Sequence, residues 1–324
     1  MAITLAQAKV GMANKVDQTI VDTFRRSSLL LDMLVFDDAI SPGTGGSTLA
    51  YGYIQLKTPS TAGVRAINEE YVASEAIREE KTTKAAIIGG AFEIDRVIAE
   101  TSGAIDELAF QATQKIKATA SEFSNLVING VKGEKSFDGL STLLSGTDME
   151  ISSTVDLSTS ALVDDNYNAL LDEVDAFLAE FDGTPSMLLM NSKMLGKMRS
   201  AARRAGYFAQ ERNEFGKVVE KYNDIPMVDA GKYFNGTNTV DIVPVEDDGT
   251  TAIYGVVIGL DGFHGISPTG NKVIVSRMPD LSAPGVMKRG DVELVAGVAL
   301  KNTRKAGVLK GIKIDAGDAG DAEG

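Results

Sequence analysis

The sequence predicts an α+β protein in which one very long helix lies between an extended hairpin and a compact mixed lobe. Apolar residues recur every three or four positions across residues 95–129, which is the spacing of a helix with one buried face. Residues 49–56 and 82–94 carry strand patterns separated by a polar stretch. From residue 164 a helix, a strand and a second helix follow one another, and residues 291–314 are again strand-rich.

The composition is that of a soluble globular protein with about two domains. The chain has 324 residues, of which 44% are hydrophobic, and a mean hydropathy near zero. No stretch approaches the roughly 18 consecutive apolar residues of a membrane helix, and MAITLAQAKVG lacks the pattern of a secretory signal. The absence of cysteine removes disulfides, thiolate nucleophiles and cysteine-based zinc or iron sites.

The chain is acidic, with 32 basic and 45 acidic residues and a formal net charge of −13. A protein that grips nucleic acid mainly through its phosphates needs the opposite balance. The same charge suits a container whose polyanionic contents must not adhere to the wall.

The first 47 residues predict a helix followed by a hinge. Apolar residues are spaced as in a helix over residues 5–27, and Thr4 and Gln7 have the spacing of a capping box. The sequence SPGTGGS at residues 41–47 favours no regular structure, which indicates a hinge.

The hairpin predicted next has two interpretations. LAYGYIQL at residues 49–56 forms the outgoing strand, and turn-forming residues separate it from a return strand over residues 82–94. One interpretation is an ordinary hairpin with a long polar tip. The other is an arm laid on a neighbouring subunit, because a long hairpin is marginal alone and its unpaired edges invite another chain.

The long helix is the strongest periodic signal in the sequence. Acidic residues crowd its first turns, as the helix dipole favours, and Gly103 is the one point where it could be interrupted. A continuous helix over residues 95–129 would be a rod of roughly 50 Å, suited to act as a spine. Its predicted buried face consists of Val97, Thr101, Ile105, Leu108, Ala112, Ile116, Ala120, Phe123 and Val127.

The lobe is predicted from residue 160 onward. It contains an amphipathic helix at 164–181, a buried strand at 187–190 and a helix to residue 205 that Asn191 or Ser192 caps. Shorter strands are predicted at residues 225–228, 240–245 and 252–258. The end of the chain, DAGDAGDAEG, is acidic, rich in glycine and expected to be disordered.

The histidine and serine content does not predict a catalytic site. His264 is the only histidine, so pairs of histidines are excluded, and its sequence DGFHG indicates a loop residue without a catalytic role. A serine triad would need His264 as its base; Ser267 is near in sequence, but the chain has no Gly-x-Ser-x-Gly elbow.

Phosphate, carboxylate and calcium motifs are equally weak. GTGG at residues 43–46 precedes no helix that could present its amides to phosphate. The pairs Asp164-Asp165 and Asp247-Asp248 lie at a helix start and in a turn, and the second lacks the ligand ladder of a calcium loop. No catalytic, cofactor-binding or metal-binding residue is therefore predicted.

One segment is basic against the overall charge. From Lys193 to Lys221, eight basic residues accompany only three glutamates. The segment is either a solvated helix face followed by a loop or a contact with an acidic surface of a neighbouring subunit. Nucleic acid ranks third, because no aromatic residues are interleaved with the charges.

The order of these parts resembles a tailed-bacteriophage major capsid protein with the Hong Kong ninety-seven fold. Each matching phrase is weakly specific, but together they cover nearly the whole chain in the expected order. The phrases are TFRRSSLLLDMLVF at the end of the arm, IIGGAFEIDRVIAE entering the spine, FDGLSTLL after it, SMLLMNSKMLGKMR and KYNDIPMVDAG in the lobe, and VELVAGVALKNTRKAGVLKGI near the end.

The resemblance implies a domain plan. Its parts are an N-terminal arm and hinge (1–47), an extended loop or E-loop (48–91), a peripheral or P domain with the spine helix and a β-sheet (92–159), an axial or A domain (160–268), return strands of the peripheral domain (269–315) and a disordered acidic tail (316–324).

The resemblance also implies a function. Subunits of this family form hexamers and pentamers that close into an icosahedral shell around double-stranded DNA, assembled in the host bacterial cytoplasm, and the extended loop lies over the adjacent subunit. Residues 125–144 would form the junction after the spine, with Phe137 and Leu140 anchoring the turn in the core. The implied partners are other copies of the chain, a portal and a decoration protein; no membrane, cofactor or enzymatic reaction is implied.

Two departures and two rival functions accompany the resemblance. Only about 47 residues precede the loop, which leaves no room for the scaffolding extension of some relatives and predicts a separate scaffolding protein. Lys57 and Asn302 are the residues that would form the loop-to-peripheral-domain crosslink of other relatives; complete dissociation in hot denaturing detergent would exclude it. The rivals are an encapsulin-like cellular nanocompartment shell and an enzyme of unknown type.

Overall fold

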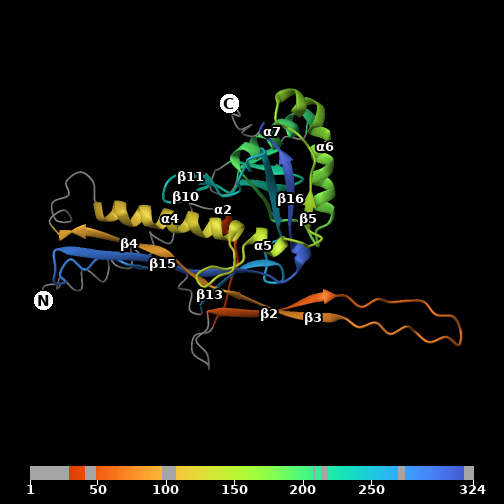
Figure 1. Ribbon diagram of the computed structural model, residues 1–324, viewed down its shortest axis with the longest axis horizontal. Coiled ribbons are helices and arrows are strands. Elements are labelled where there is room, and N and C mark those ends of the chain that lie inside the picture. The colour runs from red at the N-terminus through yellow and green to blue at the C-terminus, as the bar shows by residue number, and fades with distance from the viewer. Residues whose placement is uncertain are drawn as a thin grey trace, which may run out of the picture.

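The computed structural model describes residues 29–40, 49–96, 107–206, 209–212, 218–268 and 274–316. The predicted helix over residues 5–27 and the hinge at 41–47 lie outside these residues, as do residues 317–324 of the acidic tail. Figure 1 shows three parts: a long helix lying along a sheet, a compact lobe on one side of that layer, and a thin two-stranded arm extending away from the body.

The sheet beneath the long helix is built around one strand, β15 (Met287–Leu300), which pairs along its length with three others. One edge of β15 pairs antiparallel with β4 over ten residues, and β14 and β13 also pair antiparallel with it, β14 toward its start and β13 at its end. β1 pairs parallel with β13. The other strands of this sheet are β1 (Phe36–Ile40), β4 (Ala86–Asp95), β13 (Phe263–Pro268) and β14 (Ile274–Arg277).

The long helix, α4 (Glu107–Asn129), confirms the predicted face and end but not the predicted start. Asp95 is the last residue of β4, paired with Met287, so a helix beginning at Asp95 is wrong; residues 97–106 lie outside the described structure. The long partner strand β15 holds the chain extended to this point, which overrides the helical spacing. The 23 residues of α4 span about 35 Å at the usual helical rise.

Burial follows the predicted helical spacing closely. The buried residues of α4 include Ala112, Ile116, Ala120, Phe123 and Val127, all of which were expected on one face. All of these except Ala112 pack with residues of β4, β15 and the short helix α2 (Leu29–Met33) in one continuous hydrophobic core. At about 25 cal/mol per Å² of apolar surface, this seam supplies much of the free energy that joins helix to sheet.

The lobe contains a seven-stranded sheet packed against two helices (Figure 1). α6 begins where the Thr159 side chain accepts a hydrogen bond from Leu162 N, and α7 begins where Asn191 caps Met194 N at 2.7 Å. The predicted strand at 187–190 and the Asn191 cap are thus confirmed. The elements are β5 (Glu150–Ser152), α6 (Ser160–Ala179), β6 (Met187–Met190), α7 (Ser192–Ala205), β7 (Ala209–Arg212), β8 (Val218–Tyr222), β9 (Ile225–Asp229), β12 (Thr250–Val256) and β16 (Ala306–Lys313).

The strand predicted over residues 240–245 is shorter than expected. Among the described residues β11 (Thr239–Asp241) pairs with β10 (Lys232–Phe234) alone, and the buried Ile242 and Val243 that follow are not in a strand. Side chains take the place of a partner strand, because Asn129 donates to the Ile242 carbonyl at 2.7 Å and Asn191 to the Val243 carbonyl at 3.2 Å.

Two strands differ from the predicted domain plan in the sheet they join. β13 lies within the range 160–268 assigned to the axial domain, yet it pairs with β15 and β1. β16 lies within the range 269–315 assigned to the peripheral return, yet it pairs with β12 and β5 in the lobe. The chain therefore passes between the two layers through the short helix η1 (Thr303–Lys305), between β15 and β16.

The turn after α4 is closed by two glycines in backbone contact. Gly139 N donates to the Gly130 carbonyl at 2.8 Å, and a Cβ on Gly130 would lie 2.4 Å from the Leu126 carbonyl oxygen. The approach brings Phe137 and Leu140, at the start of α5 (Leu140–Leu144), into the core, where both are almost fully buried. The predicted anchoring role of these two side chains is confirmed.

The close approach gives a stability prediction for this turn. Gly130→Ala should lower the free energy of unfolding by about 2 kcal/mol, because the added methyl forces two backbone segments apart. Gly133→Ala is the matched control, since its Cβ would meet nothing within 4 Å, and should change stability by less than about 0.5 kcal/mol. Denaturant titration of both variants measures the difference in their free energies of unfolding. Equal losses in the two variants would show that the close contact at Gly130 does not contribute to stability.

Candidate functional site

The arm, residues 50–84, is a two-stranded ribbon that leaves the body of the protein (Figure 1). β2 (Ala50–Thr58) and β3 (Ile77–Lys84) pair antiparallel from Ala50 opposite Lys84 to Thr58 opposite Ile77, and with no other strand among the described residues. The predicted return strand over residues 82–94 is wrong as one unit. Its first residues end β3 and the rest form β4 in the body, with the buried Ala85 between them.

The arm is anchored at its root, defined as Tyr51, Tyr53, Gln55 and Thr83. The Thr83 hydroxyl donates to the Val298 carbonyl at 3.0 Å, and the Gln55 amide donates to the Leu300 carbonyl at 3.5 Å. Tyr53 is buried against Ala85, Ile266 and Ala299 in a small second core. Burial raises the pKa of Tyr53 above its ordinary value, as expected for a phenol removed from water.

Tyr51 links the root to three further groups. Its hydroxyl donates to Asp37 Oδ2 on β1 at 3.1 Å, and Lys301 Nζ lies 5.6 Å from the centre of its ring. The ring stacks on Tyr53 at 6.0 Å between centroids and meets His264 edge-on at 5.9 Å. The first residues of the arm are therefore held by packing, hydrogen bonds and charge together.

His264 is a core residue of β13, so its prediction as a loop residue is wrong. The sequence DGFHG indicates a turn, but the turn ends at Gly262, and pairing with Ala299 of β15 places His264 inside the sheet. Ser267 lies three residues further along the same strand, so its side chain points to the opposite face. The two residues cannot form the nucleophile and base of a triad.

The tip of the arm, residues 59–76, has its own hydrogen bonds but no core. Ser74 Oγ accepts from Thr61 N at 2.8 Å and donates to the Thr61 carbonyl at 2.9 Å, and the Arg65 guanidinium lies 5.3 Å from the Tyr71 ring centre. Val64, Ile67 and Val72 are each more than 90% exposed. A tip with ordered bonds and bare aliphatic side chains has the character of an interaction surface.

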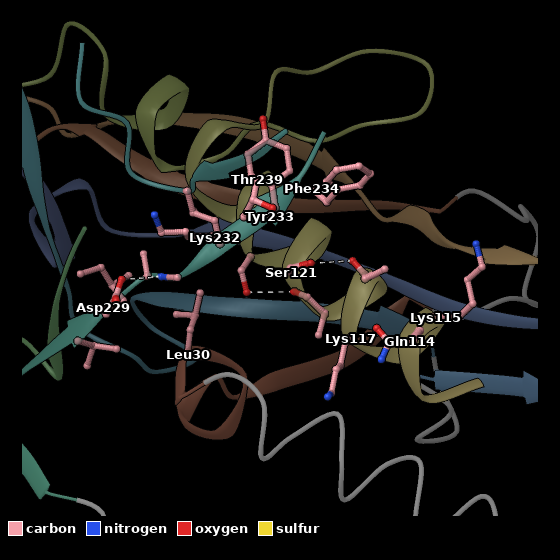
Figure 2. A pocket seen from close by; sticks show the side chains of 18 of the residues that line it. Leu30, Gln114, Lys115, Lys117, Ser121, Asp229, Lys232, Tyr233, Phe234 and Thr239 are labelled. Carbon is pink, nitrogen blue, oxygen red and sulfur yellow. Dashed lines mark hydrogen bonds between the residues drawn. The ribbon is translucent and has the colours of Figure 1, made fainter. Parts of the chain in front are cut away.

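A groove of about 760 Å³ lies between α4 and the β10–β11 hairpin. Figure 2 shows Lys117 and Ser121 on the helix side and Lys232, Tyr233 and Phe234 on the hairpin side. Lys232 is already paired with Asp241 at 3.1 Å. The groove combines apolar and basic side chains with the hydroxyl groups of Ser121, Ser124 and Thr239.

The described residues contain no cluster of three histidine or acidic side chains placed to hold a metal ion, and no described helix is long and apolar enough to cross a membrane. One carboxylate of each pair has a partner within the chain: Asp164 accepts from Arg204, and Asp248 accepts from Thr250. The GTGG segment lies outside the described residues.

The basic segment over residues 193–221 forms ion pairs within the chain. Lys193 pairs with Asp315 at 2.9 Å, Arg199 with Glu220, and Arg204 with Asp164. Two of these acidic partners lie far away in the sequence, which is why counting nearby glutamates overstated the excess charge. These exposed pairs contribute little to stability, and they reduce the basic character of this surface.

The predicted crosslink residues are separately engaged within one subunit. Lys57 is exposed on the arm and pairs with Glu79 at 3.8 Å. The Asn302 side chain accepts from Arg304 N at 3.0 Å and donates to Asp182 at 2.9 Å, capping η1. A bond between Lys57 and Asn302 of different subunits stays a prediction.

Comparison with solved structures finds the same fold in protein shells. The holo-SrpI encapsulin complex from Synechococcus elongatus PCC 7942 superposes with a TM-score of 0.62 and 15% identity over 91% of this chain and 90% of that chain. The capsid of the native GTA particle gives a TM-score of 0.56 and 12% identity over 88% and 90%. The capsid of Myoviridae phage XM1 gives a TM-score of 0.51 and 12% identity over 87% of this chain and 91% of that chain.

The chain has the Hong Kong ninety-seven capsid fold, as these structures show. The three structures named above are protein shells. No protein-family model matches the sequence, and no curated protein matches it. The likeness is therefore one of three-dimensional structure, carried at 12–15% identity.

We expect substitution of tyrosine by alanine to affect stability differently in the root and in the tip. Tyr53→Ala should lower the free energy of unfolding by about 3 kcal/mol and speed hydrogen exchange in β2 and β3, because a buried ring is lost from the second core. Tyr71→Ala in the tip is the control and should change stability by less than about 0.5 kcal/mol. Equal losses in the two variants would contradict the division into root and tip.

Proposed function

We propose that this protein is the major capsid protein of a tailed bacteriophage, which self-assembles as hexamers and pentamers into an icosahedral shell around double-stranded DNA. The observation that carries the proposal is the arm: an anchored root and an ordered tip with bare apolar side chains, on the fold of known shells. The alternative interpretation of the hairpin, an ordinary one with a polar tip, fits these aliphatic residues poorly.

The arm is proposed to lie over the adjacent subunit. Its outward face carries Ile54 and Leu56, both more than half exposed, in addition to Val64, Ile67 and Val72 of the tip. Full burial of each of these side chains would be favourable by roughly 1.5–3 kcal/mol of free energy. A neighbour that covers them gains that free energy and also covers the unpaired edges of the ribbon.

The remaining parts take the roles of the family plan. The layer of α4 with the β15 sheet is the proposed peripheral domain, and the lobe is the proposed axial domain, whose subunits meet around the capsomer axis. The acidic composition favours a wall that repels packaged DNA. A portal, a separate scaffolding protein and a decoration protein are the further proposed partners, and the virion is the proposed location.

A nanocompartment shell is the second candidate, and the groove beside α4 is the observation that favours it. Its volume and mixed lining suit an extended peptide, which is how a shell could hold an enclosed enzyme. The two candidates share the shell and differ in contents. Enclosed nucleic acid therefore distinguishes them.

Electron microscopy of the purified chain, expressed alone and with its neighbouring genes, tests the shared part. We expect closed shells tens of nanometres across. Monomers that persist when the neighbouring genes are co-expressed would contradict both candidates. Genome-length DNA that survives nuclease treatment of the particles would support the phage capsid. A co-purifying enzyme without DNA would support the nanocompartment shell.

The tip gives a prediction specific to assembly. The combined variant Val64→Ser, Ile67→Ser and Val72→Ser should leave the unfolding free energy of the unassembled chain within about 0.5 kcal/mol, because these side chains touch no core. It should lower the yield of shells at least about tenfold, since each contact is repeated in every subunit. Shell yield by sedimentation measures this.

The matched control introduces serine into the same tip without removing much apolar surface. Ala62→Ser combined with Ala73→Ser should assemble normally, since both positions are exposed and small. Normal assembly of the triple variant would show that the tip does not contribute to subunit contacts.

A further inference from the structure

The only histidine of the sequence lies beneath the root of the arm, in an unusual hydrogen-bonding state. His264 is fully buried, its Nδ1 lies 3.3 Å from the Gly262 carbonyl, and its Nε2 has no hydrogen-bond partner among the residues that the structure describes. The contact to Gly262 assigns the proton to Nδ1, which leaves Nε2 as a bare acceptor. Burial without a partner is costly for either nitrogen and far more so for a cation.

The ring is surrounded by charged and titratable groups from four directions. Tyr51 contacts it from β2, Asp37 lies on β1, Lys301 follows β15, and Asp261 precedes β13. Asp261 is already paired with Lys305, and Asp37 already accepts a hydrogen bond from the Tyr51 hydroxyl at 3.1 Å. The ring of Tyr51 therefore has Lys301 over it and His264 at its side.

We propose that His264 acts as a pH-sensitive latch, holding the arm root against the body while neutral and releasing it when Nε2 is protonated. A proton on Nε2 would create a buried N–H without an acceptor and a second cation beside the Tyr51 ring. The new cation would also compete for Asp37, whose hydrogen bond to Tyr51 holds the start of β2. Moving the root away exposes the imidazolium to water and relieves all three conflicts.

The direction of the pH effect follows from the same geometry. Burial, opposed in part by the Gly262 contact, lowers the pKa of His264 below its ordinary value of 6.5. The open form, with the ring in water, regains the ordinary pKa. Stability of the closed root is therefore complete above pH 6.5 and is lost as the pH falls below that value. Each pH unit below it raises the ratio of open to closed root by up to about tenfold, until the closed form also titrates.

The latch goes beyond the proposed function and does not depend on it, because root and histidine belong to one chain. Hydrogen exchange of β2 and β3 in the full-length protein, followed from pH 8 to pH 5 and normalised to peptides of α6, is the first measurement. Because the chain has one histidine, the imidazole proton signal in NMR reports its titration without ambiguity. Relative to α6, we expect exchange at the root to rise by up to about tenfold between pH 8 and pH 5.5, with the protection of α6 unchanged.

His264→Asn separates the latch from general acid destabilisation. The asparagine amide can replace Nδ1 as donor to Gly262 but cannot take up a proton, so its root should exchange at the same normalised rate across the whole range. An acid rise as large in His264→Asn as in the unmodified chain would overturn the proposal. So would a histidine that titrates at or above pH 6.5.

If the variant does not fold, measurements on the unmodified protein still test the proposal. The rise in root exchange must begin near pH 6.5, where the exposed ring takes up a proton, and the histidine signal must titrate below that value. A root that opens at a different pH, or does not open at all, would also overturn the proposal. Shell assembly is not needed for any of these outcomes, so the proposed function is tested separately.

Discussion

The structure depends on the pairing of one long strand, β15, with three of the other strands in the layer beneath the long helix. Its ten-residue antiparallel pairing with β4 fixes the strand that leads from the arm toward the long helix. Its end pairs with β13, and beyond β4 the carbonyls of Val298 and Leu300 accept hydrogen bonds from the arm root. After Leu300 the chain crosses to β16 in the lobe. A shift in the register of β15 would therefore move the helix, the arm and the lobe together.

The arm illustrates how one short sequence can serve two environments. At the root, alternate residues of β2 face the body, so Tyr51, Tyr53 and Gln55 are covered while Ile54 and Leu56 are left in water. Farther out both faces are exposed, and the tip is held only by its own turn contacts. The body thus fixes where the arm begins and leaves its far end exposed.

Basic side chains of this acidic protein form ion pairs with individual acidic residues of other elements. The acidic excess of the whole chain coexists with a basic helix, α7, whose lysine and arginine side chains find acidic partners from α6, β8 and the end of β16. Such exposed pairs add little stability, but they join elements that are distant in sequence. The one histidine is placed differently, since it is removed from water without any acidic group bonded to it.

Local patterning by itself determined the apolar face of α4, the strand at Met187–Met190 and the Asn191 cap, whereas the anchoring of Phe137 and Leu140 was implied by the family resemblance. Capping and periodicity act within a few residues, so they can be read from neighbours in the chain. The tertiary structure alone decided that Asp95 ends a strand, that residues 82–94 divide between arm and body, and that His264 is buried. Each of these depends on pairing with β15. The residues of β15 that pair with β4 lie about 200 residues further along the sequence, and the residue that pairs with His264 lies about 35 residues further along. No local pattern records which partner a strand will find.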